Sequence, residues 1–316
     1  MLIYCIPLAL AIAAVLLRVR ALEHIALLYA CAILLFRDGV GYDYENYVRI
    51  FEIDRSFFLA PLANILQDLA RLLSIPNGFI GAVALLTTSL LLYLSRTSVS
   101  PRLSIIVFFA FPLFFLDSFT IVRQHLAVVV AAWSYQLLRQ NKDLWSVVAY
   151  LVATGIHPSA AVSLPIFALV NPKLNWKYLV IAPLIFGVFI VVAKMFLSSN
   201  LAQFYAQTRL EGDYFIIVSG AALLVSIFFK DRELITCAAF GFLTAIAVVE
   251  FGNYALNRLI VFFYIPFLFA PLRSRLFRMP MHTLVTMTII SALFFAAFQV
   301  KLQEPRNGFI PYETIF

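Results

Sequence analysis

Four short polar clusters interrupt an otherwise apolar sequence, and each contains a residue type that binds anions or moves protons. The clusters cover residues 37–47, 123–127, 155–159 and 250–258. Three of them contain a candidate anion ligand: Arg37, Arg123 and Arg258. A guanidinium stays charged and binds phosphate oxygens through a planar fork. We therefore expect these arginines to hold a diphosphate group and to stabilise negative charge that develops on it.

The first cluster combines a cation with carboxylates and tyrosines, whose rings and hydroxyls suit contact with a sugar. Its members are Arg37, Asp38, Tyr42, Asp43, Tyr44, Glu45 and Tyr47. Asp43 and Glu45 also have the spacing of a carboxylate pair that holds a divalent metal, which leaves a metal site open as an alternative. A solvated loop with an aromatic belt at the membrane surface is the plainer alternative.

The other clusters have plain structural alternatives too. Arg123 could extend to the lipid head groups along an apolar stem. His157 stands before Pro158, and a histidine in such a turn is often incidental. Glu250 and Arg258 could form an interfacial ion pair.

The elements that must position these clusters are membrane helices. The chain has 316 residues, of which 63% are hydrophobic and 12% are charged, and its mean hydropathy is +0.96. Soluble domains are about half apolar and a quarter charged. A helix needs about 20 apolar residues to cross a bilayer, and helices satisfy their own backbone in lipid. The composition therefore predicts an all-α, polytopic integral membrane protein with a single transmembrane domain over residues 1–316.

The apolar runs predict about 12 transmembrane helices. These cover residues 2–17, 22–36, 78–94, 103–116, 119–138, 144–156, 159–170, 178–193, 214–229, 234–249, 259–271 and 282–300. Residues 57–73 are apolar too, but Asn64, Gln67, Asp68 and Arg71 interrupt them. We therefore expect this segment to be re-entrant or interfacial rather than membrane-spanning.

Charge then sets the orientation. The net charge of +7 is explained by basic loops between apolar runs, and short basic loops stay cytoplasmic. This arrangement places both termini and the four clusters on the opposite side. It also removes the need for a nucleic-acid partner. The three cysteines lie in apolar runs without CxxC spacing, so neither a disulfide framework nor a metal site is expected. Arg18 and Arg20 follow the first apolar run, so we expect a first span rather than a cleaved leader.

The clusters resemble, in the same order, the motifs of EpsG-type proteins. Arg37, Gly41, Asp43, Asn46 and Tyr47 resemble the family's R-x(n)-G-x-D-x-x-x-Y loop. Arg123-Gln124 with Leu126-Ala127 resembles its R-Q-x-L-A stretch, and His157-Pro158-Ser159 resembles its H-x-S turn. Asn257-Arg258 followed by Tyr264 resembles its N-R-x(n)-Y segment.

This resemblance implies a Wzy-like polysaccharide polymerase, a GT-C-type glycosyltransferase of the bacterial inner membrane. Such enzymes join undecaprenyl-diphosphate-linked oligosaccharide repeat units at the periplasmic face during O-antigen or exopolysaccharide synthesis. The resemblance implies no metal, cofactor or nucleotide sugar. The implied partners are the lipid-linked oligosaccharide, membrane lipid, a flippase and a chain-length regulator.

In this reading, His157 is the first candidate for the general base, because an imidazole is partly neutral at pH 7. Asp43 is the second candidate. The expected glycan contacts are Tyr42, Tyr44, Tyr47, Tyr254, Gln124 and Glu250. One alternative is a metal-dependent transferase that uses a polyprenyl-phosphate sugar, with Asp43 and Glu45 as ligands. Another is a flippase or transporter, which should also carry functional charge on its inner-facing segments.

Overall fold

The structure is a computed structural model of the whole chain, and part of the chain is described in it. The described residues are 2–41, 44–52, 60–74, 78–97, 101–111, 113–163, 167, 211–229, 231–251, 257–269, 292, 295, 296, 313 and 314. The predicted span 178–193, all of 282–300 except residues 292, 295 and 296, and half of 159–170 lie outside these residues. The described part is mostly helical, which agrees with the predicted all-α class.

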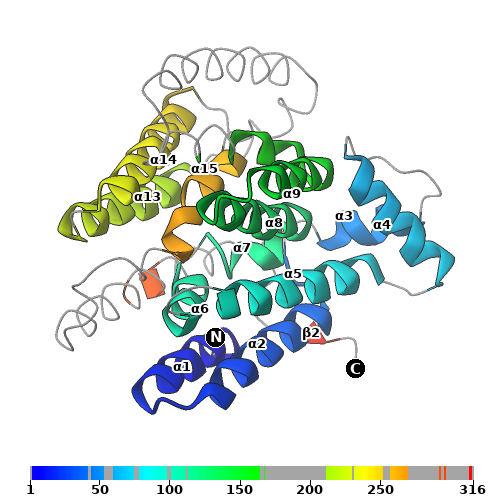
Figure 1. Ribbon diagram of the computed structural model, residues 1–316. Coiled ribbons are helices and arrows are strands. Elements are labelled where there is room, and N and C mark those ends of the chain that lie inside the picture. The colour runs from blue at the N-terminus through cyan, green and yellow to red at the C-terminus, as the bar shows by residue number, and fades with distance from the viewer. Residues whose placement is uncertain are drawn as a thin grey trace.

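Five helices stand side by side in a row. They are α1 (Leu2–Leu16), α2 (Arg20–Leu35), α5 (Gly78–Thr97), α8 (Val122–Arg139) and α9 (Asp143–Ile156). Each one packs on the next, and Figure 1 shows the row from α1 to α9. The tight turns that join α1 to α2 and α8 to α9 contain Arg18 and Asn141 with positive φ angles of 57° and 59°.

A second pair of long helices, α13 (Glu211–Phe229) and α14 (Arg232–Phe251), forms an antiparallel hairpin beside this row. Asp231 caps α14, because its Oδ1 accepts hydrogen bonds from the backbone nitrogens of Glu233 and Leu234. α15 (Asn257–Phe263) and the 3-10 helix η3 (Ile265–Leu268) lie between the hairpin and α8, in orange in Figure 1.

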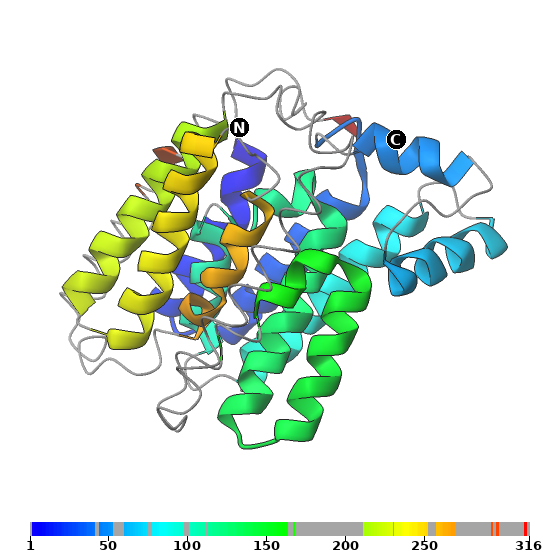
Figure 2. The same ribbon diagram turned by 90° about the horizontal axis from the view of Figure 1, so that it is seen from above.

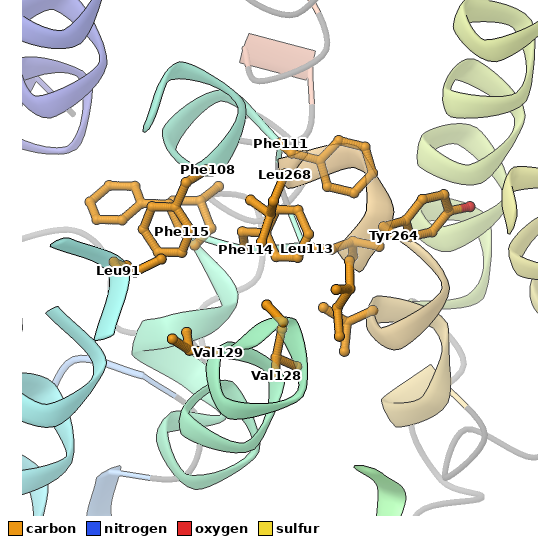
Figure 3. Packing of buried hydrophobic residues seen from close by; sticks show 14 of the residues in the cluster. Leu91, Phe108, Phe111, Leu113, Phe114, Phe115, Val128, Val129, Tyr264 and Leu268 are labelled. Atoms are coloured by element: carbon orange, nitrogen blue, oxygen red, sulfur yellow. The ribbon is translucent and has the colours of Figure 1, made fainter. Parts of the chain in front are cut away.

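An aromatic core fills the space between the helix row, the α13–α14 hairpin and η3. It is built around α6 (Pro101–Ala110), the short helix α7 (Asp117–Thr120) and η3. Figure 3 shows rings from the α6–α7 segment facing Val128 and Val129 of α8, with Tyr264 and Leu268 beside them. Phe111 contacts the ring of Tyr264 at 4.9 Å between centroids. This core fixes the start of α8 against the start of α15, which matters for the site.

Among the predicted spans, two that are wrong as continuous helices are interrupted beside a proline. The run 103–116 contains α6, which ends at Ala110, and α7 begins only at Asp117. The run 259–271 contains α15, which ends at Phe263, followed by η3. Each break lies next to a proline, Pro112 and Pro266. Proline lacks the amide N–H and disfavours helical backbone in the residue before it.

Among the described residues, α14 contains the one stretch that is long and apolar enough to cross a membrane, Arg232–Val249. Shorter apolar helices are Ile3–Leu16, Gly78–Leu94, Asp143–Ile156 and Phe215–Ile227. The predicted number of about 12 spans therefore stays a prediction.

Two short amphipathic helices, α3 (Tyr44–Glu52) and α4 (Pro61–Leu72), lie beside the row. α4 buries Ala63, Gln67 and Ala70 and exposes the apolar residues Ile65 and Leu69. Its 12 residues span about 18 Å at 1.5 Å each, which is too short for a bilayer. It runs across the direction of α8 and α9 (Figure 2). The helix is therefore not a continuous span, and the re-entrant or interfacial placement of residues 57–73 stays a prediction.

Candidate active site

The loop after α2 wraps around one backbone carbonyl, that of Phe119 in α7. Arg37 belongs to a two-residue strand, β1 (Arg37–Asp38), which pairs with β2 (Glu313–Thr314). Its Nη1 donates a 2.7 Å hydrogen bond to the Phe119 oxygen. The guanidinium carbon lies 5.5 Å from the centroid of the Phe119 ring and 5.9 Å from that of Tyr44. Arg37 is only 2% exposed, so its guanidinium lies among protein groups. Its role in binding the diphosphate stays a prediction.

Gly41 completes this loop on the other side of the same carbonyl. Its φ of +107° is a conformation that favours glycine. A Cβ at this position would overlap the Phe119 oxygen. Glycine is therefore required here both by the backbone angle and by the space.

Two of the predicted glycan-binding tyrosines are held by neighbouring protein groups. The Tyr44 hydroxyl donates a 2.9 Å hydrogen bond to Asp38 Oδ1. Burial, and then this bond to Asp38, raise the pKa of Tyr44 to about 12, so it remains a neutral phenol. The Tyr47 ring packs on Phe79 with centroids 5.5 Å apart. Both tyrosines are buried, so most of each ring already contacts protein.

The first turns of α8 and α15 meet through one hydrogen bond. Gln124 Nε2 donates to the backbone carbonyl oxygen of Arg258 over 2.5 Å. Gln124 is buried, and Arg123 and Arg258 are half-buried. Gln124 and Arg258 are 134 positions apart in the sequence. The bond therefore fixes the backbone that carries one candidate arginine to the helix that carries the other.

His157 lies in the turn between α9 and the 3-10 helix η1 (Pro158–Val162). Its backbone is extended, with φ −149° and ψ 123°, and it serves as the N-cap of η1. The ring nitrogen Nδ1 lies 2.6 Å from Ser159 Oγ and accepts a bond from the Ser159 backbone nitrogen at 3.3 Å. The side chain is 6% exposed. η1 packs on both α8 and α15, which brings this turn to the two arginines.

The two arginines act electrostatically on His157. Burial lowers the pKa of His157 well below its ordinary value of 6.5, and the positive charges of Arg123 and Arg258 lower it further. The imidazole is therefore neutral at pH 7. The site thus contains two fixed cations and one neutral imidazole, supplied by three separate elements.

The structure brings Arg123, Gln124, Arg258 and His157 together, whereas Arg37 lies with Tyr44 around Phe119. Tyr42, Asp43 and Tyr254 lie outside the described residues. Glu250 belongs to α14, and its side chain is likewise outside the described part. The roles assigned to these residues from the sequence stay predictions.

Sequence reasoning missed two contacts of this site. The first is the bond from Ser159 to His157; the pairing of a histidine with a serine two residues later, around a proline, is the signal that could have indicated it. The second is the approach of α4, where a Cβ at Gly155 would lie 3.0 Å from Leu62 Cδ1. This approach places an amphipathic helix next to the turn of His157, and no sequence signal pointed to it.

Glu45, one of the two carboxylates considered for a metal, lies near the Arg49 guanidinium at 3.7 Å, and both side chains are mostly exposed. Within the part of the chain that the structure describes, no three His, Cys, Asp or Glu side chains gather as a metal site would require.

Comparison with known proteins identifies a family. The model of the EpsG family matches residues 21–314, which is nearly the whole chain. No curated protein and no solved structure matches.

Proposed function

Because the chain belongs to the EpsG family, a membrane protein family of Wzy-like polysaccharide polymerases, we propose that it polymerises undecaprenyl-diphosphate-linked oligosaccharide repeat units. We place this reaction at the periplasmic face of the bacterial inner membrane, in the synthesis of O-antigen or exopolysaccharide. The basic loops on the opposite side support this orientation.

The observation that carries the proposal is the grouping of Arg123, Arg258 and His157. Two half-buried guanidiniums close to a neutral imidazole form a site for an anion with several oxygens. A diphosphate attached to a membrane lipid is such an anion, and it occurs where polar head groups meet hydrocarbon. Arg123 and Arg258 lie at the beginnings of α8 and α15, and His157 follows the end of α9. These three side chains therefore lie at the same end of the helices.

In the proposed step, the bond from the anomeric carbon of the growing glycan to its diphosphate oxygen breaks. The lipid diphosphate leaves with the electron pair of that bond. The same carbon forms a bond to a hydroxyl oxygen of the incoming lipid-linked repeat, and the proton of that hydroxyl passes to a base. The sequence offers His157 and Asp43 for this base.

The arginines contribute in two ways. They bind the diphosphate in the ground state, and they stabilise the extra negative charge that it acquires as the anomeric bond breaks. Because Gln124 holds the Arg258 backbone and both helices are fixed by the aromatic core, these donors are positioned before the substrate binds. Such preorganisation is what makes electrostatic stabilisation effective in a low-dielectric site.

The test uses the purified full-length protein in lipid nanodiscs. Lipid-linked repeat units are extracted from cells of the source strain that lack this gene, and polymer is followed as a ladder on a gel. We expect a ladder from the wild-type protein and none from an Arg123→Ala/Arg258→Ala double variant of normal yield and folding. A folded wild-type protein that leaves the single repeats unchanged, in the presence of the lipids of that strain, contradicts the proposal.

A further inference from the structure

The hydrogen bonds of His157 assign its proton to one ring nitrogen. Nδ1 lies 3.3 Å from the backbone nitrogen of Ser159, and a backbone N–H can only donate. Nδ1 is therefore the acceptor of this bond and carries no proton. The Ser159 hydroxyl, 2.6 Å from the same nitrogen, donates to it as well. In a neutral imidazole the hydrogen then resides on Nε2.

We propose that His157 donates a hydrogen bond from Nε2–H to a phosphate oxygen of the lipid-linked substrate, and that Ser159 is the residue that positions the ring for this role. His157 then takes the place of an anion ligand rather than that of the general base. The identity of the anion rests on the function proposed above. The hydrogen-bond assignment itself depends only on the His157–Ser159 geometry.

The surroundings of the ring favour a neutral donor. Arg123 and Arg258 already supply two positive charges, and both act on His157. A third positive charge would be repelled by them in a buried place, whereas a neutral N–H adds a directed donor without that repulsion. Among the described residues, Nδ1 is the ring nitrogen that bonds within the protein. Nε2 therefore remains for a ligand.

The same geometry opposes the role of a base. To accept a proton at Nε2, the ring must first carry its hydrogen on Nδ1. That hydrogen would face the Ser159 backbone N–H, so two donors would oppose each other, and the cap of η1 would be lost. The proton of the acceptor hydroxyl therefore passes to a different base, of the carboxylate class, for which the sequence offers Asp43.

Two substitutions at His157 distinguish a hydrogen-bond donor from a general base. A glutamine places an amide N–H close to the position of Nε2, but it cannot take up a proton. We expect His157→Gln to keep polymerisation within about tenfold of wild type, and His157→Ala to lose about 10²–10³-fold, the usual effect of one missing donor to a developing anion. If His157 were the general base, both variants would lose activity equally.

Binding gives a second readout that does not need turnover. The probe is a short-chain polyprenyl diphosphate, with its affinity measured by titration of the protein in nanodiscs. A donor predicts that His157→Ala weakens binding at least tenfold while His157→Gln remains close to wild type. If His157 were the general base, it would act on the acceptor, and both variants would bind the probe as wild type does. Ser159→Ala should weaken binding several-fold and Ser159→Thr, which keeps the hydroxyl, should restore it; a purely structural serine would change yield and not affinity.

The outcomes distinguish this inference from the proposed function. If the wild-type protein polymerises repeats but the glutamine and alanine variants bind the probe equally well, the donor role fails and the function stands. If the wild-type protein binds the probe with the predicted order of variants but makes no polymer, the function fails and the donor role stands. A folded wild-type protein with no affinity for the probe overturns both.

Discussion

Gly41 and Phe119 approach so closely that the Phe119 carbonyl oxygen occupies the space where a Cβ of residue 41 would lie. The same oxygen accepts the hydrogen bond from Arg37. Phe119 lies four residues before Arg123 in the chain. The loop of the first polar cluster is therefore fixed against the segment that leads into the second.

The first prediction concerns this contact. Gly41→Ala should destabilise the protein by more than about 2 kcal/mol, because alanine is strained at this positive φ and its Cβ would also overlap a backbone atom. Gly39→Ala is the matched control: Gly39 has a φ of +61°, but a Cβ added there would have no atom within 4 Å, so only the backbone strain of about 1–2 kcal/mol applies. Thermal unfolding in detergent measures both. If the unfolding temperature fell equally in the two variants, the overlap with Phe119 would contribute nothing to stability.

The second prediction concerns the pair Ser134 and Ser146, which fastens α8 to α9. Each hydroxyl donates to the backbone carbonyl of the other residue, at 2.8 and 2.9 Å. Both are fully buried. We expect Ser134→Ala and Ser146→Ala to cost about 0.5–1.5 kcal/mol each. The double variant should lose less than the sum, since either loss loosens the same helix contact.

Thr88→Val serves as the control for this pair, because the Thr88 hydroxyl bonds to Ala84 within its own helix. It should leave stability nearly unchanged, as no second helix depends on that bond. Strict additivity of the two serine variants in the unfolding free energy would contradict the coupling.

Much of the helical framework could be predicted from the sequence. The runs 78–94 and 144–156 correspond to α5 and α9 within a few residues, because charges or glycine bound an apolar stretch on each side. The broken helices at Pro112 and Pro266 were predictable in principle, since proline removes a backbone donor. Hydropathy alone does not show that loss, so it extended the predicted span 103–116 past the end of α6 and joined α15 to η3 in the span 259–271.

The candidate site could be predicted only in part. Arginine and histidine are recognisable by residue type, so Arg123, Arg258 and His157 were identifiable. The hydrogen-bond acceptors of Arg37 and Gln124 were not, because the carbonyl oxygens of Phe119 and Arg258 belong to the backbone and have no residue-specific signature. The grouping of α8, α15 and η1 depends on the packing of the aromatic core, which is decided by contacts distant in sequence.

The third prediction concerns acid. The pKa of His157 is well below 6.5 in the folded protein and near 6.5 in the unfolded chain. Between these values the unfolded chain binds a proton that the folded protein does not, so this residue reduces stability as the pH falls below about 6.5. His157→Gln removes that contribution. Its unfolding free energy should therefore fall less steeply with acid than that of wild type, by up to about 1.4 kcal/mol per pH unit.

The measurement is denaturant unfolding at several pH values between about 7.5 and about 5, a window that brackets the ordinary histidine pKa. His24→Gln is the control for the substitution itself, because His24 is exposed on α2 and lies outside the site. Parallel curves for wild type and His157→Gln would show that His157 titrates alike in both states.

The fourth prediction concerns metal. Polymerisation should survive EDTA, because the proposed stabilisation of the diphosphate comes from guanidiniums and an imidazole rather than from an ion. The assay compares initial rates before and after chelation, with added Mg²⁺ or Mn²⁺ as the reference. Loss of activity in EDTA and its return with either ion would favour the metal-dependent alternative. In that case Asp43→Asn and Glu45→Gln should prevent the added ion from restoring activity.

The fifth prediction concerns Arg123 and Arg258, the two arginines at the starts of α8 and α15. Arg123→Lys and Arg258→Lys should fail nearly as badly as the alanine variants, with rates about 10²–10³-fold below wild type, or about 3–4 kcal/mol. Lysine keeps the charge, but it lacks the planar fork that binds two phosphate oxygens at once. Initial polymerisation rates of purified variants in nanodiscs give the comparison.

Arg96→Lys provides the matched control, because Arg96 is exposed in the last turn of α5 and takes no part in the site. It should polymerise at the wild-type rate. If the lysine variants at 123 and 258 retained most of the activity while the alanine variants lost it, the site would need only positive charge. Wild-type rates from both alanine variants would reduce Arg123 and Arg258 to anchors at the membrane surface. The proposed binding of a diphosphate would then lose its physical basis, since His157 alone is neutral and offers one donor.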